Sequence, residues 1–223
     1  MNIVLIPGLD GTGELFAELI PHLGDNEIQV IDLPQQGDQS YEFLCAYVVQ
    51  KLPKRDFILV AESFSGPIGA LLAKSGLVHM KGIVFVATFL TPPNKALISI
   101  AKLLPIKQLL RFPLSSLVVR YLMLGQSASE IVAQRFFQIL SNIPNAVLKA
   151  RLTTVQNFVF NDREISVPAI YIRAEKDKLV PKNKCLEFEN YFINLKIQTI
   201  SGPHFILQSS PKQCAKIISQ AFK

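Results

Sequence analysis

The sequence predicts an α/β protein in which about six mainly parallel strands form a sheet flanked by helices. Short runs rich in β-branched and aromatic residues alternate with longer segments of helical periodicity along most of the chain. Most of these short runs are apolar along their whole length, which is the pattern of strands buried on both faces. Alternation of strands and helices is typical of parallel sheets, because parallel neighbours need a crossover connection.

The predicted elements alternate regularly up to about residue 90 and again after residue 163. The strands are expected at residues 2–6, 29–32, 57–61, 82–87, 169–173 and 196–200. The helices are expected at residues 15–22, 40–50, 66–75, 182–190 and 214–222. The helices between strands supply the crossovers that a parallel sheet requires.

One long stretch interrupts this alternation. Residues 91–163 contain no predicted strand, and their apolar residues recur at helical spacing with interruptions at three prolines and a glycine. A structureless loop of this length is improbable in a compact domain. We therefore expect three or four helices here, forming a helical subdomain inserted after the fourth predicted strand, with residues 1–90 and 164–223 as the core.

The composition excludes several classes of protein. Of the 223 residues 49% are hydrophobic and 18% are charged, which excludes a disordered chain. No apolar run reaches the length of about 18 residues expected of a membrane-spanning helix. Residues 1–6 lack the basic start of a signal peptide, so we expect a strand there and a cytoplasmic protein.

Cysteine and histidine are too few for a disulfide framework or a structural zinc site. The three cysteines form no Cys-x-x-Cys pair, and the chain has only three histidines. We expect partly buried thiols in a reducing compartment, no metal site and no organic cofactor.

A serine follows the third predicted strand directly. Ser63 stands between two small residues, Ala61 and Ser65, and a helix rich in small residues comes next. This order is typical of a nucleophile elbow, a turn so tight that side chains two residues before and after the serine must be small. The amides after the serine would lie at a helix N-terminus, which favours a developing oxyanion. An ordinary strand-to-helix turn is the alternative interpretation of this segment alone.

A glycine-containing loop follows the first predicted strand. Its pattern, Gly8-x-x-Gly11-x-Gly13, suits either a phosphate loop or a loop whose amides bind an oxyanion. The spacing matches neither common nucleotide-binding motif, and no lysine follows. We favour the second interpretation, with the backbone N–H groups of Leu9 and Phe64 as the two donors.

Two further polar residues follow the last two predicted strands. Asp177 lies in the loop after residues 169–173, where Glu175 is a competing carboxylate closer to the strand end. His204 lies in the loop after residues 196–200. A solvated carboxylate and a structural histidine are the alternative interpretations of each residue taken alone.

Taken together, these residues predict nucleophilic catalysis. Ser63, Asp177 and His204 each follow a predicted parallel strand, so all three should project from the same edge of the sheet. A serine hydroxyl is a poor nucleophile until a base takes its proton. His204 would be that base, and Asp177 would fix its tautomer and stabilise the imidazolium.

With these motifs in this order, essentially the whole chain resembles the α/β-hydrolase fold family. The resemblance implies that Ser63 is the nucleophile, Asp177 the acid and His204 the base. It also implies that the insertion is the family's cap or lid. The activity it implies is that of a serine carboxylesterase that hydrolyses esters of short or medium acyl chains through an acyl-enzyme.

The chain departs from the family's pattern in four places. The first strand pair of the usual eight-stranded sheet is absent, and Pro7-Gly8 stands where His-Gly is common. Glu62 precedes the nucleophile where His or Gln is frequent, and Pro203 replaces a common Gly.

A haloalkane dehalogenase is disfavoured, because its chemistry needs a carboxylate at position 63.

The insertion carries the whole excess of positive charge. The net charge is +6, of which residues 91–163 hold +7 (nine basic and two acidic residues) and the rest of the chain −1. A solvated face is one interpretation, and docking of an acidic partner that delivers the substrate is the other; acyl carrier protein, coenzyme A or an anionic membrane surface would qualify. For the second interpretation, the candidate contact residues are Arg111, Arg120, Arg135 and Arg151.

Among capped hydrolases, the chain is similar to small carboxylesterases that hydrolyse pimeloyl-acyl-carrier-protein methyl ester. Acyl carrier protein is the partner that this similarity implies. No nucleic-acid recognition motif is visible. An acyl-carrier-protein or CoA thioesterase is the alternative function, and a non-catalytic binding protein on the same fold is the alternative from another class. We expect a monomer or a weak dimer.

Overall fold

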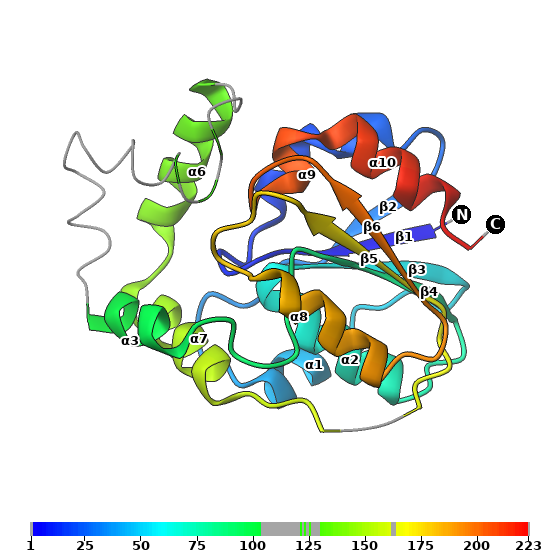
Figure 1. The fold of residues 1–223 in the computed structure, drawn as a ribbon, viewed down its shortest axis with the longest axis horizontal. Coiled ribbons are helices and arrows are strands. Elements are labelled where there is room, and N and C mark those ends of the chain that lie inside the picture. Colours follow the sequence, from blue (N-terminus) through cyan, green and yellow to red (C-terminus); the bar gives the residue numbers. More distant parts are fainter. Residues whose placement is uncertain are drawn as a thin grey trace.

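The structure, a computed structural model, describes residues 2–103, 121, 123, 125, 130–161 and 164–222. Its centre is one six-stranded sheet in the order β2-β1-β3-β4-β5-β6, with every neighbouring pair parallel (Figure 1). The strands are β1 (Asn2–Ile6), β2 (Glu27–Val30), β3 (Phe57–Glu62), β4 (Met80–Val86), β5 (Ala169–Ala174) and β6 (Leu195–Ile200). The predicted fold class is therefore confirmed, and all its strand pairs are parallel.

Helices cover both faces of the sheet (Figure 1). One face carries α1 (Tyr41–Val49), α2 (Gly66–Lys74) and α8 (Lys182–Leu186), and the other carries α9 (Ile206–Ser209) and α10 (Pro211–Gln220). Alternate residues of β3 pack on the two sides: Leu59 joins the core cluster with α1 and α2, and Val60 joins the one with α9 and α10. Burial on both faces explains why the strands are apolar throughout.

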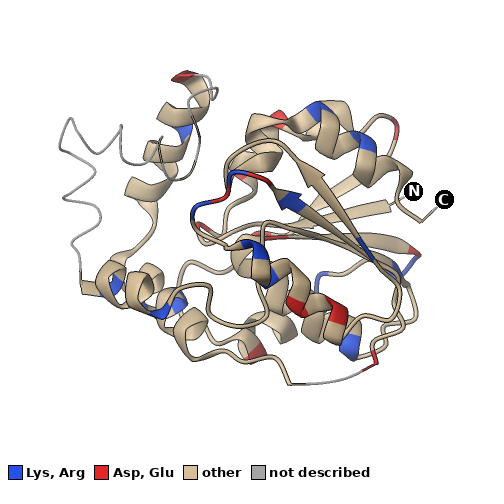
Figure 2. Cartoon of the chain, in the orientation of Figure 1, with Lys and Arg blue, Asp and Glu red and all other residues tan. Residues whose placement is uncertain are grey.

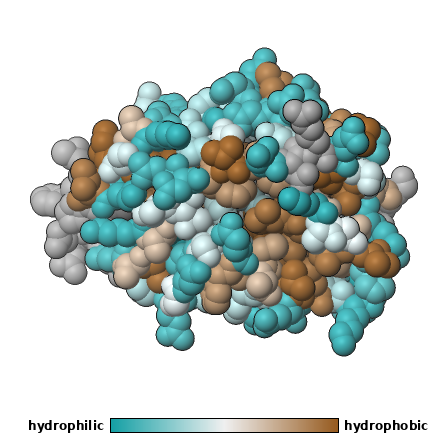
Figure 3. All heavy atoms as spheres, turned by 90° about the horizontal axis from the view of Figure 1, so that it is seen from below, coloured by the Kyte–Doolittle hydropathy of each residue, from teal (hydrophilic) through white to brown (hydrophobic). Residues whose placement is uncertain are grey.

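The outer sides of the helices face solvent. Figure 3 views the face that carries α1, α2 and α8, and apolar and hydrophilic side chains are interspersed on it. Single exposed apolar residues such as Phe43 and Leu186 are normal at a protein surface. None of the described helices is long and apolar enough to cross a membrane.

Three segments differ from the predicted helices. Residues 15–22 form two short 3-10 helices, Gly13–Glu18 and Ile20–His22, because Pro21 lacks the N–H that a continuous α-helix needs. Residues 182–190 divide into α8 and the 3-10 helix Glu187–Asn190. The final helix starts earlier than predicted, since α10 begins at Pro211, a residue well suited to the first helical position.

The order of the strands places a crevice at the carboxyl ends of β1 and β3. The chain leaves β1 to form β2 on one side and returns to form β3 on the other. In open α/β sheets, ligands bind in the crevice outside the carboxyl ends of the strands, where the direction of winding reverses. The loop after β1 and the turn at Ser63 border this crevice, so the topology already points to a site there.

Three of the helices among the described residues lie between β4 and β5 in the chain: α3 (Lys95–Leu103), α6 (Glu130–Asn142) and α7 (Asn145–Asn157), which we call the inserted helices. α3 and α7 pack against each other, and all three lie beyond the carboxyl ends of the strands (Figure 1). The predicted cap spans residues 91–163, and part of that range lies outside the described residues. The structure therefore does not test the expected number of cap helices.

Candidate active site

Ser63 occupies a sharp turn between β3 and α2. Its φ angle is 47°, in the left-handed region that non-glycine residues seldom adopt. Neighbouring side chains hold the strained turn in place: the Thr88 hydroxyl donates to the Ser63 carbonyl oxygen, and the Tyr41 hydroxyl donates to the Phe64 carbonyl oxygen at 3.1 Å. Thr88 is itself fixed, because its N–H donates to the Tyr171 hydroxyl oxygen at 2.9 Å. The turn therefore presents the Ser63 hydroxyl in one defined position.

The small residues expected on either side of the serine have distinct roles in the structure. Ala61 is buried in the core, and Ser65 is also fully buried, with its hydroxyl donating to the Pro7 carbonyl oxygen. This hydrogen bond ties the elbow to the loop after β1. The tightest packing falls one residue later, at Gly66, where a Cβ atom would overlap the Thr88 side chain.

Replacing Gly66 with alanine should therefore lower the free energy of unfolding by about 1–3 kcal/mol, because the new methyl group would force Thr88 away from Ser63. Urea unfolding monitored by circular dichroism measures this change. Gly8→Ala is the matched control, since a Cβ there would meet its nearest neighbours at ordinary distances of 3.6 and 3.7 Å. Equal stability of the two variants would contradict the steric argument.

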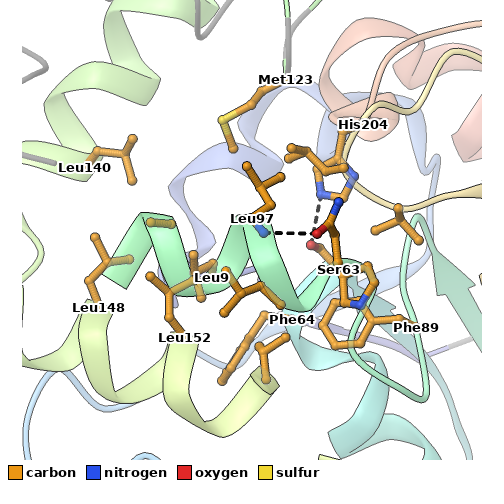
Figure 4. Close-up of a pocket in the computed structure, with 17 residues that line it drawn as sticks. Leu9, Ser63, Phe64, Phe89, Leu97, Met123, Leu140, Leu148, Leu152 and His204 are labelled. Carbon is orange, nitrogen blue, oxygen red and sulfur yellow. Dashed lines mark hydrogen bonds between the residues drawn. The ribbon is translucent and has the colours of Figure 1, made fainter. Parts of the chain in front are cut away.

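The structure brings together the three side chains that the sequence singled out. Ser63 Oγ lies 2.9 Å from His204 Nε2 (Figure 4). His204 Nδ1 lies 2.8 Å from Asp177 Oδ2. The other carboxylate oxygen of Asp177 accepts the N–H groups of Leu179 at 2.8 Å and Val180 at 2.9 Å. Both oxygens of Asp177 are thus held, which fixes the orientation of the imidazole.

The competing carboxylate, Glu175, takes no part in this arrangement. It is exposed at the end of β5, whereas the side chains of Asp177 and His204 are each only 5% exposed. Two residues further along the loop, Asp177 faces the histidine. Of the two carboxylates in this loop, the structure therefore places Asp177, and not Glu175, in contact with the histidine.

The environment of His204 raises its pKa. Burial is the largest influence and by itself would lower the pKa, but the charge of Asp177 and its hydrogen bond raise it, and Glu62 adds to this. Together the two carboxylates outweigh burial, so the pKa lies above its ordinary value of 6.5. An imidazole of this kind accepts a proton readily, because the resulting cation is stabilised.

The two expected oxyanion donors both lie at the cavity beside Ser63. Leu9 and Phe64 line it together with Ser63 and His204. The N–H of Phe64 stands in the first turn of a helix, where N–H groups lack an intrahelical acceptor. The loop that carries Leu9 is closed by a hydrogen bond of 3.0 Å from the Gly11 N–H to the Gly8 carbonyl oxygen.

Glu62, noted as unusual in the sequence, is buried on the side of the sheet that α9 covers. Its carboxylate accepts a hydrogen bond of 3.1 Å from Gln208 Nε2. Burial, reinforced by the charge of Asp10, raises the pKa of Glu62 to about 7. Glu62 therefore changes its charge near neutral pH, close to the histidine whose pKa it influences.

An apolar cavity of about 310 Å³ opens beside Ser63 and His204. The inserted helices supply much of its wall: Leu97, Ile98 and Ala101 from α3, Leu140 from α6, and Leu148, Leu152 and Val155 from α7. In Figure 4, Leu140 and Leu148 lie at the end of the cavity remote from Ser63. The shape and lining suit an aliphatic chain attached to a group that reaches Ser63.

The structure changes the interpretation of the basic residues in the insertion. Lys and Arg occur on each inserted helix (Figure 2), but only some of them are available to a partner. Arg111 and Arg120 lie outside the described residues. Arg135 is half-buried in an ion pair with Glu18, its Nη1 2.9 Å from Oε1. Arg151 is completely buried, so its expected role in partner contact is wrong.

The position of Arg151 could have been recognised from the sequence. It stands three or four residues from Val147, Leu148 and Val155, all buried on α7. A basic residue in the middle of an apolar helical stripe points inward with the stripe. The net charge of the insertion does not contain this information, because it counts buried and exposed basic residues alike.

The described residues hold no cluster of three His, Cys, Asp or Glu side chains that could bind a metal. All three cysteines, Cys45, Cys185 and Cys214, are free thiols.

No protein-family model matches the chain, and no curated protein matches it in sequence. Solved structures match it closely in fold. A lipase-esterase related protein from Clostridium acetobutylicum superposes with a TM-score of 0.81 at 16% identity, covering 97% of this chain and 92% of the other. An esterase from Exiguobacterium antarcticum gives 0.82 at 13% identity, covering 97% and 89%. A thioesterase from the prodiginine biosynthetic pathway of Streptomyces coelicolor gives 0.71 at 18% identity, covering 98% and 83%.

Proposed function

We propose that this chain, which has the α/β-hydrolase fold, is a serine carboxylesterase that acts on esters of short or medium acyl chains. The observation that carries the proposal is the continuous hydrogen-bonded series Ser63–His204–Asp177 at the edge of an apolar cavity. A binding protein without catalytic activity would have no need to bury a histidine and a carboxylate in this order beside a strained serine.

The geometry suits hydrolysis in two steps. His204 Nε2 takes the hydroxyl proton of Ser63 while Ser63 Oγ forms a bond to the ester carbonyl carbon. The N–H groups of Leu9 and Phe64 stabilise the oxyanion that results. The C–O bond to the alcohol then breaks, and His204 returns the proton to the leaving oxygen. Water, deprotonated by His204, next attacks the acyl-enzyme and releases the carboxylic acid and free Ser63. Asp177 remains ionised throughout, and no metal or organic cofactor takes part.

The inserted helices, in this proposal, act as the cap over residues 1–90 and 164–223. The acyl chain of the substrate would lie among the apolar side chains of α3, α6 and α7. The three free thiols support a reducing compartment, and we place the enzyme in the cytoplasm.

A fluorophosphonate probe tests the proposal directly, because it reacts only with an activated serine and forms a stable covalent adduct. We expect a single adduct, located at Ser63 by mass spectrometry of the digested protein. His204→Ala should react far more slowly, since the base is lost. A folded protein that is not labelled, or labelling that persists in Ser63→Ala, would overturn the proposal.

Filling the remote end of the cavity should shift the preferred chain length. Leu148→Trp should lower kcat/KM for p-nitrophenyl octanoate about tenfold, while p-nitrophenyl butyrate, which ends nearer Ser63, should change little. Ala146→Trp is the control, because Ala146 is exposed on the same helix. Equal losses on both esters would show that the cavity does not hold the acyl chain.

Thioester hydrolysis is the second candidate function, favoured by the likeness in fold to the prodiginine-pathway thioesterase. The same serine, histidine and cavity would serve, with a thiol as the leaving group. Acyl carrier protein or coenzyme A would be the carrier. The exposed Lys95 and Lys149 are the candidate contacts with the acidic carrier protein.

Paired assays separate the two candidates. If the protein hydrolyses octanoyl-CoA and octanoyl-acyl carrier protein faster than p-nitrophenyl octanoate, the result favours the thioesterase. If a carrier protein docks on the inserted helices, Lys95→Glu with Lys149→Glu should weaken turnover of the carrier-bound substrate and leave the small ester unaffected. Losses of the same size on both substrates would contradict docking there.

A further inference from the structure

Arg151 is a buried cation against the loop after β1, and the proposed mechanism does not use it. It lies on α7 with none of its surface exposed. Its guanidinium donates three hydrogen bonds: Nη1 to the Leu9 carbonyl oxygen at 2.8 Å, Nη2 to the Pro34 carbonyl oxygen at 2.9 Å, and Nε to Gln39 Oε1 at 2.9 Å.

Burying this charge is costly, and packing alone does not require it. An apolar side chain of similar length could fill the same space without the desolvation penalty. Burial lowers the pKa of Arg151 to about 10, against the opposing influence of the Asp10 charge, so the guanidinium remains a cation at neutral pH. Its planar fork of donors is what allows one side chain to hold three acceptors from separate segments.

The contact with Leu9 is the important one, because it holds the peptide group after Leu9 while a separate hydrogen bond holds the peptide group before it. The Gly8 carbonyl oxygen accepts the Gly11 N–H at 3.0 Å, and the Leu9 carbonyl oxygen accepts Arg151. With both groups held, the N–H of Leu9 has little freedom to rotate away from the cavity that Leu9 and Ser63 line.

The loop is also shaped to admit the guanidinium. Gly11 has a φ of 72°, and a Cβ atom there would lie 2.6 Å from Arg151 Nη2. Any other residue at position 11 would displace the arginine. The guanidinium also lies over the ring of Phe64, the second expected oxyanion donor, with Cζ 5.8 Å from the ring centre.

We infer that Arg151 is a positioning residue of the oxyanion hole: by binding the Leu9 carbonyl oxygen it aims the Leu9 N–H at the reacting carbonyl. The inference rests on the proposed function. It makes the rate of the chemical step depend on α7, an inserted helix that lies far in sequence from both the serine and the loop after β1.

Three variants test this role. Arg151→Met removes the donors and keeps an unbranched side chain, and Arg151→Lys keeps the charge without the planar fork. Thr154→Val is the matched control. Thr154 lies on the same helix and donates to the Gln39 carbonyl oxygen at 2.9 Å, so its loss weakens the attachment of α7 without touching Leu9.

The measurements separate positioning from stability. For Arg151→Met we expect kcat on p-nitrophenyl butyrate to fall about 10- to 100-fold with KM nearly unchanged. The inhibition constant of butylboronic acid, which forms a tetrahedral adduct with an active serine, should rise by a similar factor. The kcat and the inhibition constant of Arg151→Lys should lie between those of wild type and Arg151→Met. Thr154→Val should match wild type in both measurements.

Each outcome bears on the inference. A folded Arg151→Met variant with wild-type kcat, or one whose kcat falls while boronate inhibition stays the same, would overturn it. If Arg151→Met does not fold, Arg151→Lys carries the test, since it should lose kcat and boronate affinity together. An active wild type with unaffected variants overturns only this inference, whereas an inactive wild type overturns the proposed function as well.

Discussion

Replacing Ser63 with alanine should lower kcat for p-nitrophenyl butyrate by about 10⁴-fold or more, because no other described group beside the cavity can form the acyl-enzyme. The fold should persist. Alanine at a φ of 47° meets the same backbone restriction as serine, and the hydrogen bond from Thr88 goes to the backbone carbonyl oxygen of residue 63, which remains.

The measurement is steady-state hydrolysis at enzyme concentrations high enough to detect the residual rate. Ser75→Ala is the control, because that hydroxyl lies at the end of α2 and donates only to the Leu72 carbonyl oxygen, among the bonds of the described residues. Equal rates for wild type and Ser63→Ala would exclude the proposed mechanism.

Removing the charge of Asp177 should produce the second large effect, with a characteristic pH dependence. In wild type, kcat/KM should fall as the pH decreases through the pKa of His204, because only the neutral imidazole accepts the serine proton. Burial alone would lower that pKa, but Asp177 and Glu62 raise it above 6.5, so the midpoint of the acidic limb should lie above pH 6.5. Asp177→Asn should move the midpoint to lower pH and reduce kcat by about 10³- to 10⁴-fold.

Rate profiles from about pH 5 to pH 9 measure both effects. Glu175→Gln is the control, since this exposed carboxylate lies in the same loop and outside the hydrogen-bonded series. Glu62→Gln should move the midpoint downward by a smaller amount, because Glu62 raises the pKa of His204 less than Asp177 does. A midpoint that Asp177→Asn leaves in place would show that another group controls the acidic limb.

The sequence could predict the grouping of Ser63, Asp177 and His204 because one geometric rule covers all three. Each follows a strand of a parallel sheet, and the carboxyl ends of parallel strands meet at one edge. The rule needs no knowledge of side-chain packing. It holds even though Ser63 and His204 are separated by 141 positions in the chain.

The apolar stripe of α7 indicates that Arg151 points inward, but no such rule identifies its partners, because they belong to loops that no periodic pattern relates to α7. Arginine is usually exposed, so the residue type alone predicts a surface position. The cost of burying its charge is offset here by hydrogen bonds to three acceptors from distant segments. Similarly, the small-residue pattern around Ser63 did not identify Gly66 as the tightest position. That restriction comes from Thr88, which follows a different strand.

Strand boundaries show a related limit. Residues 29–32 were expected to form the second strand, but β2 spans Glu27–Val30. Ile31 and Leu33 continue the apolar pattern and are buried although they lie beyond the strand. A pattern of apolar residues indicates which positions are buried. Where a strand ends depends instead on which backbone groups of the neighbouring strand are in place to form hydrogen bonds with it.

The double role of α7 constrains how this protein could be re-engineered or diversify. Exchanging the insertion for that of another protein with this fold would replace the walls of the cavity and, at the same time, remove the arginine that holds Leu9. A productive chimera would need an arginine restored at position 151 and glycine kept at position 11. Leu148, three residues before Arg151, and Leu152, the next residue along the helix, line the cavity and carry no such requirement, so the cavity wall has room to change while Leu9 stays anchored.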